Sequence, residues 1–198
     1  MGRGAIVTAV GHAAHGVHEA PAKRLGINRL GLWFFILSES ILFVGLLMVR
    51  FSLLGTYIHE ELSQLIGLMI TVILLASSFT AYQAERSMAR GDLGATKRNL
   101  LITLGLGTVF IAGVAFEWHE ALEAFPPSTV FGSVFFTMTG VHVFHVLTGL
   151  VMLAIVHRRV RRHETTSTDS WPVEASVKYW HFVDVAWVFF YPALYLIS

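Results

Sequence analysis

The chain has 198 residues, of which 55% are hydrophobic and only 14% are charged, and its formal net charge is +1. A soluble domain carries about a quarter charged residues, so this composition excludes a disordered charged tail, argues against a nucleic-acid binder and indicates an integral membrane protein. Cysteine is absent, which excludes disulfides, thiolate metal sites and a cysteine nucleophile.

Five stretches are long and apolar enough to cross a bilayer, whose hydrocarbon core requires roughly 20 helical residues. They run from Leu30 to Val49, Leu62 to Ala84, Asn99 to Phe116, Val130 to Val156 and Val177 to Ile197. The connections between them are short, which leaves no room for a separate soluble domain. The sequence therefore predicts an all-α integral membrane bundle of five transmembrane helices over residues 29–198, preceded by a cytoplasmic leader over residues 1–28.

Basic residues gather in alternate connections. Of the 14 Lys and Arg residues, only Arg50 lies outside the N-terminal segment, the second-to-third connection and the fourth-to-fifth connection with its flanks. Because Lys and Arg are retained on the cytoplasmic side of short loops, this distribution predicts a cytoplasmic N-terminus and a C-terminus outside.

The leader contains His12, His15 and His18 at intervals of three residues. On a helix these imidazoles would lie roughly on one side, where they could hold a metal ion. The alternative interpretation is a cytoplasmic leader without a site.

Glu39 lies about 14 Å into the first span at 1.5 Å of rise per residue, which places it near the middle of the bilayer. An ionisable side chain at that depth is costly and requires a partner or a function. Two interpretations stay open: a structural hydrogen-bonding group and a proton-handling group.

The fourth span contains TGVHVFHVLTGL, in which His142 and His145 are three residues apart among small residues. Small residues permit another helix to approach, and buried imidazoles can then bond to it. Ligation of haem iron or copper and proton relay are the functional alternatives. A haem would require a second histidine at matching depth, and His181 lies nearer the cytoplasmic end of the fifth span.

One face of the fifth span combines aromatic and acidic side chains at helical spacing, namely Trp180, Asp184, Trp187 and Tyr191. Asp184 follows His181 by three residues, which predicts an intrahelical pair that lowers the cost of burying the acid. For Trp180, Tyr191 and Tyr195 the alternative is a place at the membrane interface.

The string FEWHEALEAF brings Glu117, His119, Glu120 and Glu123 together after the third span, on the outer side. Three acids and a histidine could chelate a divalent cation or dock a basic partner. A solvated turn ahead of Pro126 is the alternative interpretation.

Four sets of strings resemble, in order and spacing, subunit III of the haem-copper terminal oxidases: FFILSESILF, LLASSFTAY, FGSVFF with TGVHVFHVLTG, and WHFVDVAW. The resemblance extends from about Gly31 to Leu196. The long form of that family has seven helices, and this chain is similar to the short, five-helix bacterial form that lacks the first two. Removing two helices leaves the N-terminus on the same side, which agrees with the orientation predicted from charge.

This resemblance implies an accessory subunit without an active site, in an aa3-type cytochrome c oxidase of the aerobic respiratory chain. It implies a multi-pass place in a bacterial plasma membrane and no cofactor in this chain, since haem and copper belong to partner subunits. The implied partners are subunit I as the main contact, subunit II, a small subunit IV and structural phospholipids. The implied role is to support proton uptake and the stability of the catalytic core.

The resemblance also assigns residues. Glu39 matches the family's buried glutamate, which supports proton uptake. His142 and His145 match its HxxH string, and Trp180, His181 and Asp184 match its WHFVD string, which implies polar groups of a lipid cleft or subunit interface. Glu117 and Glu120 fall where related chains have an acidic, aromatic segment. Without the first two helices, part of the lipid cleft must be formed differently or by a neighbour.

Three other hypotheses remain. The equivalent subunit of a quinol oxidase or a nitric oxide reductase resembles this chain in helix count and strings. A haem-binding electron carrier would use His142, His145 and His181. An independent proton channel or transporter would be built on Glu39 and Asp184.

Overall fold

The computed structural model describes residues 21–57, 64–165 and 169–197, so His12, His15 and His18 lie outside the described residues. The described part contains five α-helices and no β-strand, which confirms the all-α prediction. The helices are α1 (Pro21–Leu54), α2 (Gln64–Ala89), α3 (Leu93–Ala124), α4 (Val130–Arg161) and α5 (Trp171–Tyr195).

Helices α1 to α4 are long and apolar enough to cross a membrane. Helix α5 has 25 residues and therefore the length to span, but Glu174, Lys178 and Asp184 interrupt its apolar sequence. Each helix extends beyond its predicted apolar stretch at one end or both, because flanking polar and charged residues remain helical, whereas α2 begins two residues later and α5 ends two residues earlier than predicted. Helix α1 already begins at Pro21, within the segment 1–28 that was expected to be a leader.

Short connections make α2 to α5 antiparallel neighbours. Gly91, with a φ of 78°, forms the tight turn after α2, and Asp92 then caps α3 by accepting a hydrogen bond from the Ala95 amide at 2.8 Å. Thr129 caps α4 in the same way, accepting from the Gly132 amide at 3.0 Å. The turns therefore fix the order in which the helices return across the bundle.

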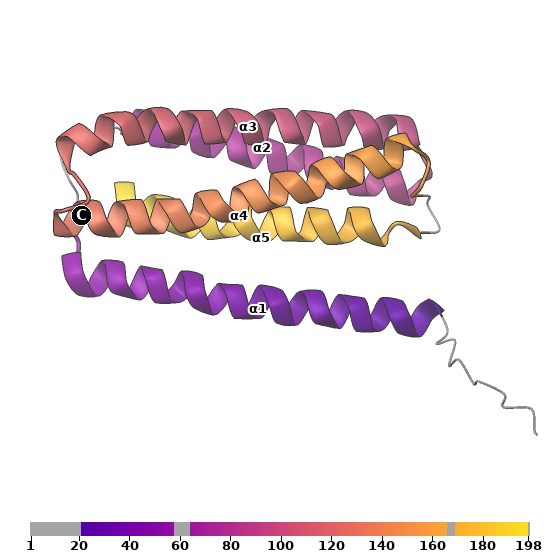
Figure 1. The fold of residues 1–198 in the computed structure, drawn as a ribbon, viewed down its shortest axis with the longest axis horizontal. Coiled ribbons are helices and arrows are strands. Elements are labelled where there is room, and N and C mark those ends of the chain that lie inside the picture. The colour runs from indigo at the N-terminus through magenta and orange to yellow at the C-terminus, as the bar shows by residue number, and fades with distance from the viewer. Residues whose placement is uncertain (1–20, 58–63, 166–168, 198) are drawn as a thin grey trace, which may run out of the picture.

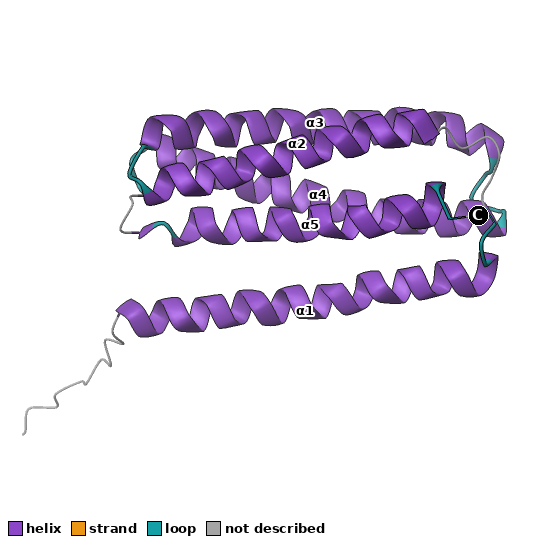
Figure 2. Ribbon diagram, turned by 180° about the vertical axis from the view of Figure 1, so that it is seen from behind, coloured by secondary structure: helices purple, strands orange, loops and turns teal. Residues whose placement is uncertain are grey.

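Helices α2 to α5 form one packed unit, and α1 lies beside it against α4 and α5 (Figure 1). Helix α2 packs most extensively on α3, while α5 contacts both α2 and α4. Seen from behind, α5 lies between α2 and α1 (Figure 2). Within residues 25–57, only Phe43 and Arg50 are buried, so the bundle leaves most of the α1 surface uncovered.

The inner face of α5 supplies the centre of the core. Trp180 and Trp187 are fully buried, and their indole nitrogens donate to Ser77 at 3.0 Å and to Thr71 at 2.9 Å on α2. The predicted one-sided face is thereby confirmed. Tyr191 and Tyr195 are also buried, so these aromatic side chains pack against protein, and their place at the membrane interface stays a prediction.

Candidate functional site

A groove of about 540 Å³ lies where α1 meets α4 and the first half of α5. Its lining is apolar apart from a carboxylate, an imidazole and two hydroxyls. We call it the Glu39 groove, and it is lined by Phe35, Glu39, Leu42, Gly140, Val141, Phe144, His145, Thr148 and Tyr179. It therefore brings together Glu39 and His145, two of the residues singled out from the sequence.

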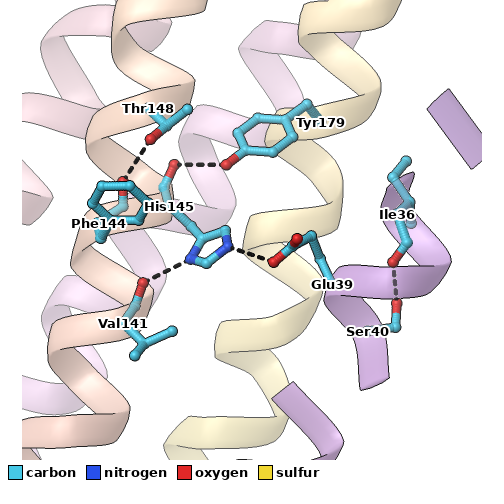
Figure 3. A network of polar contacts seen from close by, with 8 residues as sticks. All are labelled: Ile36, Glu39, Ser40, Val141, Phe144, His145, Thr148 and Tyr179. Atoms are coloured by element: carbon cyan, nitrogen blue, oxygen red, sulfur yellow. Dashed lines mark hydrogen bonds and ion pairs between the residues drawn. The ribbon is translucent and has the colours of Figure 1, made fainter. Parts of the chain in front are cut away.

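Glu39 and His145 form a direct pair across the groove (Figure 3). His145 Nε2 lies 3.1 Å from Glu39 Oε2, and His145 Nδ1 lies 2.7 Å from the carbonyl oxygen of Val141. Because a carbonyl only accepts, Nδ1 carries a hydrogen and donates it. Nε2 then faces the carboxylate, where it can donate to Glu39 if it carries a hydrogen or accept from a protonated Glu39 if it does not. This geometry suits a group that takes up or releases a proton.

The surrounding helices fix this pair in place. Val141 lies one turn before His145, so the ring folds back along its own helix, and Tyr179 of α5 donates to the His145 carbonyl at 3.3 Å. The hydroxyls of Thr148 and Ser40 bond to the backbone of their own helices. The Glu39 side chain is 23% exposed and that of His145 is 8% exposed, so the carboxylate is the member that the groove leaves accessible.

His142 does not join the groove. It is fully buried in the bundle, with its ring 4.7 Å from the Trp187 ring and 5.8 Å from the Phe110 ring between centroids. Neither of its nitrogens has a hydrogen-bond partner among the described residues. The two histidines of the fourth span thus face different surroundings, and His145 has both nitrogens engaged by Val141 and Glu39.

His181 and Asp184 of α5 do not contact each other either. His181 Nδ1 lies 2.6 Å from the hydroxyl of Ser78 on α2. Asp184 is buried next to the same Ser78, and no hydrogen bond or ion pair joins it to His181 in the described part of the chain. The predicted His181–Asp184 pair is therefore wrong, because a hydroxyl of the neighbouring helix takes the place of the carboxylate.

Glu117 and Glu120 do not form one exposed cluster. Helix α3 continues to Ala124, so Glu117 stays on its inner face, where it is 3% exposed and accepts a hydrogen bond from the Tyr195 hydroxyl at 2.7 Å. Glu120 is exposed. The interpretation of Glu117 as part of a solvated turn is therefore wrong. Within the described residues, no group of three or more histidine or acidic side chains is placed to hold a metal ion.

A charged contact that sequence reasoning missed joins the first half of α1 to the start of α5. Glu174, in the first turn of α5, lies 3.1 Å from Arg29 and is also bonded to Lys178 one turn later. Burial alone would raise the pKa of Glu174, but the hydrogen bonds from Lys178 and Arg29 outweigh it and hold that pKa below the ordinary value. Glu174 and Lys178 are four residues apart on one helix, a spacing from which their pair could have been predicted. Arg29 is 145 positions from Glu174, so the sequence gives no indication of that contact.

The polar residues of both contacts lie within a stretch that matches known proteins. Residues 7–198 match the family described as cytochrome c oxidase subunit III. Cytochrome c oxidase subunit 3 of Coturnix japonica is 35% identical over 190 residues, which cover 90% of this chain and 72% of that protein. The Bos taurus protein of the same name gives the same identity and coverage. The Synechocystis protein of that name is 31% identical over 191 residues, with 93% and 80% covered.

Proposed function

Since the chain belongs to the cytochrome c oxidase subunit III family, we propose that it is an accessory, non-redox subunit of an aa3-type cytochrome c oxidase in an aerobic respiratory chain. In this role it packs on subunit I in a bacterial plasma membrane, with subunit II and a small subunit IV as further neighbours. Its N-terminus is cytoplasmic and its C-terminus lies outside. Haem and copper belong to the partner subunits.

The observation that carries this proposal is the Glu39–His145 pair on an otherwise apolar groove. The two side chains lie 3.1 Å apart, the carboxylate is accessible, and Glu39 lies near the middle of a spanning helix. An isolated acid at that depth is energetically costly, so the presence of Glu39 there beside a histidine indicates a functional role. It supports proton uptake by the catalytic core and does not itself perform redox chemistry.

The exposed surface of α1 supports the binding of phospholipid. Acyl chains fit the apolar lining of the Glu39 groove, next to a helix that the rest of the chain leaves almost uncovered. Exposed arginines at the end of α4 supply positive charge for lipid phosphates, namely Arg158, Arg159, Arg161 and Arg162. Bound lipid would shield Glu39 from bulk solvent while it keeps α1 in position.

Purification of the tagged chain from native membranes in mild detergent tests this function. We expect it to bring down the large oxidase subunits, an a-type haem spectrum and phospholipid phosphorus. Removal of the chain should leave the haem content of the core intact and shorten its activity during turnover. A chain recovered alone, or one that carries its own haem, would overturn the proposal.

A further inference from the structure

The carboxyl group of Asp184 is enclosed inside the bundle. Asp184 is 3% exposed, and the fully buried Trp180 and Trp187 lie one turn before and after it on the same face of α5. No ion pair joins it to a basic side chain among the described residues. An ionised carboxylate without such a partner is costly to bury, so the group is stable in this place when it carries a proton.

Ser78 of α2 lies between this carboxyl group and His181. Its hydroxyl oxygen is 2.6 Å from His181 Nδ1, and Asp184 lies next to the same hydroxyl. His181 and Asp184 are three residues apart on one helix, so both side chains meet α2 at the serine. A hydroxyl can donate one hydrogen bond while it accepts another. The three side chains therefore form a chain along which a proton can pass.

His181 is the accessible end of this chain. It is partly exposed, and its Nε2 has no hydrogen-bond partner in the described part of the molecule and is not among the buried atoms that lack one. Lys178 lies one turn earlier in α5, bonds to Glu174 and interacts electrostatically with Glu85 of α2. Both acids line a pocket of about 310 Å³ at this end of the bundle. His181 thus lies between the buried Asp184 and a charged end, which is cytoplasmic in the proposed orientation.

We propose that Asp184 is a proton-binding site that exchanges one proton with the charged end of the bundle through Ser78 and His181. In the starting state the hydrogen of neutral His181 is on Nε2. On release, the Asp184 hydrogen moves to Ser78 Oγ while the Ser78 hydrogen moves to His181 Nδ1. The Nε2 hydrogen then leaves to water, which ends with a neutral His181 and an ionised Asp184. Uptake reverses each step. The site is separate from the Glu39 groove, which lies where α5 meets α1 and α4, and it does not depend on the proposed function.

Isotope-edited infrared spectroscopy of the full chain in lipid nanodiscs tests the charge state of Asp184. The sequence has three aspartates, and Asp92 and Asp169 are exposed, so carbon-13-labelled aspartate introduced by cell-free synthesis reports a buried aspartic acid through Asp184 alone. At neutral pH we expect a protonated carboxyl band that shifts with the label and is absent in Asp184→Asn. The labelled unmodified chain gives this result even where Asp184→Asn does not fold. A labelled spectrum with carboxylate bands only would overturn the site.

A rapid rise in pH, followed by the loss of the labelled carboxyl band, tests the route. The band should disappear several-fold more slowly in Ser78→Ala and His181→Leu than in the unmodified chain, with helical content unchanged. Ser78→Thr keeps the hydroxyl and should restore the rate. Thr108→Ala is the control, because the exposed Thr108 hydroxyl bonds only to Leu104 of its own helix. A merely structural Ser78 would alter Tm without slowing the loss of the band. Equal rates in Ser78→Ala and the unmodified chain would therefore overturn the route.

Discussion

The indole of Trp180 lies directly against Gly149, where an added Cβ would come within 2.8 Å of Trp180 Cε3. A Cβ at Gly107 of α3 would come within 2.7 Å of Cη2 of the same ring. Because Nε1 of that indole donates to Ser77 of α2, one side chain of α5 contacts three other helices. Gly107 and Gly149 leave the space that this indole ring occupies.

We predict that Gly149→Ala destabilises the bundle by about 1–3 kcal/mol, since the added methyl group forces the buried indole to shift. Gly140→Ala on the same helix is the control, because its Cβ would lie 3.7 Å from the Trp118 ring, an ordinary contact. Thermal unfolding of the purified chain in one detergent measures both. A smaller loss for Gly149→Ala than for Gly140→Ala would contradict this packing.

Glu39→Gln should leave assembly and the haem content of the complex unchanged but alter proton uptake or shorten activity during turnover. The carboxamide can still donate to His145 Nε2, so the bond survives while the transferable proton is lost. The measurement is the number of turnovers before inactivation, together with proton uptake in reconstituted vesicles.

Two further variants separate the loss of the Glu39–His145 bond from a general effect of substitution in this part of α1. Glu39→Leu removes the bond as well, and should weaken the attachment of α1 by about 1 kcal/mol. Ser40→Ala is the neutral control, because the Ser40 hydroxyl bonds only to Ile36 of its own helix. Loss of haem from the complex in Glu39→Gln would count against an accessory role.

Tyr195→Phe should destabilise the chain by about 1–3 kcal/mol, because it leaves the buried Glu117 carboxyl without its hydroxyl donor. Glu117→Gln should cost less, since a carboxamide oxygen still accepts from Tyr195. Glu120→Gln, at an exposed position, should change stability by under about 0.5 kcal/mol. Denaturant titration of the three variants checks this order, and equal effects at Glu117 and Glu120 would refute it.

The bonds that Glu174 makes with Arg29 and Lys178 should make stability depend on pH in acid. Its pKa is lower in the folded chain than the ordinary value of 4.5, so its contribution is present above pH 4.5 and is lost as the pH falls through the folded pKa. The difference in Tm between the unmodified chain and Glu174→Gln should therefore shrink below pH 4.5. Glu164→Gln, at an exposed residue 3.8 Å from Arg162, should show a smaller difference throughout. A difference for Glu174→Gln that grows in acid would contradict the ion pairs.

Hydrophobic runs and helical periodicity predicted much of this architecture. They identified five helices and the buried face of Trp180, Asp184, Trp187 and Tyr191. The same periodicity was available for Glu117, which continues the buried series of Thr103, Gly107, Phe110 and Val114 along α3. It was missed because acidic neighbours and two prolines suggested a solvated turn.

Contacts between distant helices could not be read from spacing. The depth of Glu39 predicted that it needs a partner, but nothing in the sequence chose His145 over His142, since both are in one span. The choice depends on the rotation of α4, which buries His142 against Trp187 and turns His145 toward α1. For the same reason, the contact between Arg29 and Glu174 could not be predicted, since the two residues are 145 positions apart in the sequence.

Few buried side chains attach α1 to the other four helices, so we expect the chain to unfold in two steps. Within residues 25–54, Phe43 is the one buried apolar side chain. The buried Arg50 bonds to the carbonyls of Gly55 and Tyr57 just beyond its own helix. Helices α2 to α5 share the aromatic core, so we expect them to unfold together and α1 to detach first. During synthesis α1 emerges before α2 to α5, yet its docking surface on α4 and α5 is complete only after α5 has been made. Of these five helices, α1 is therefore the last to be held in place.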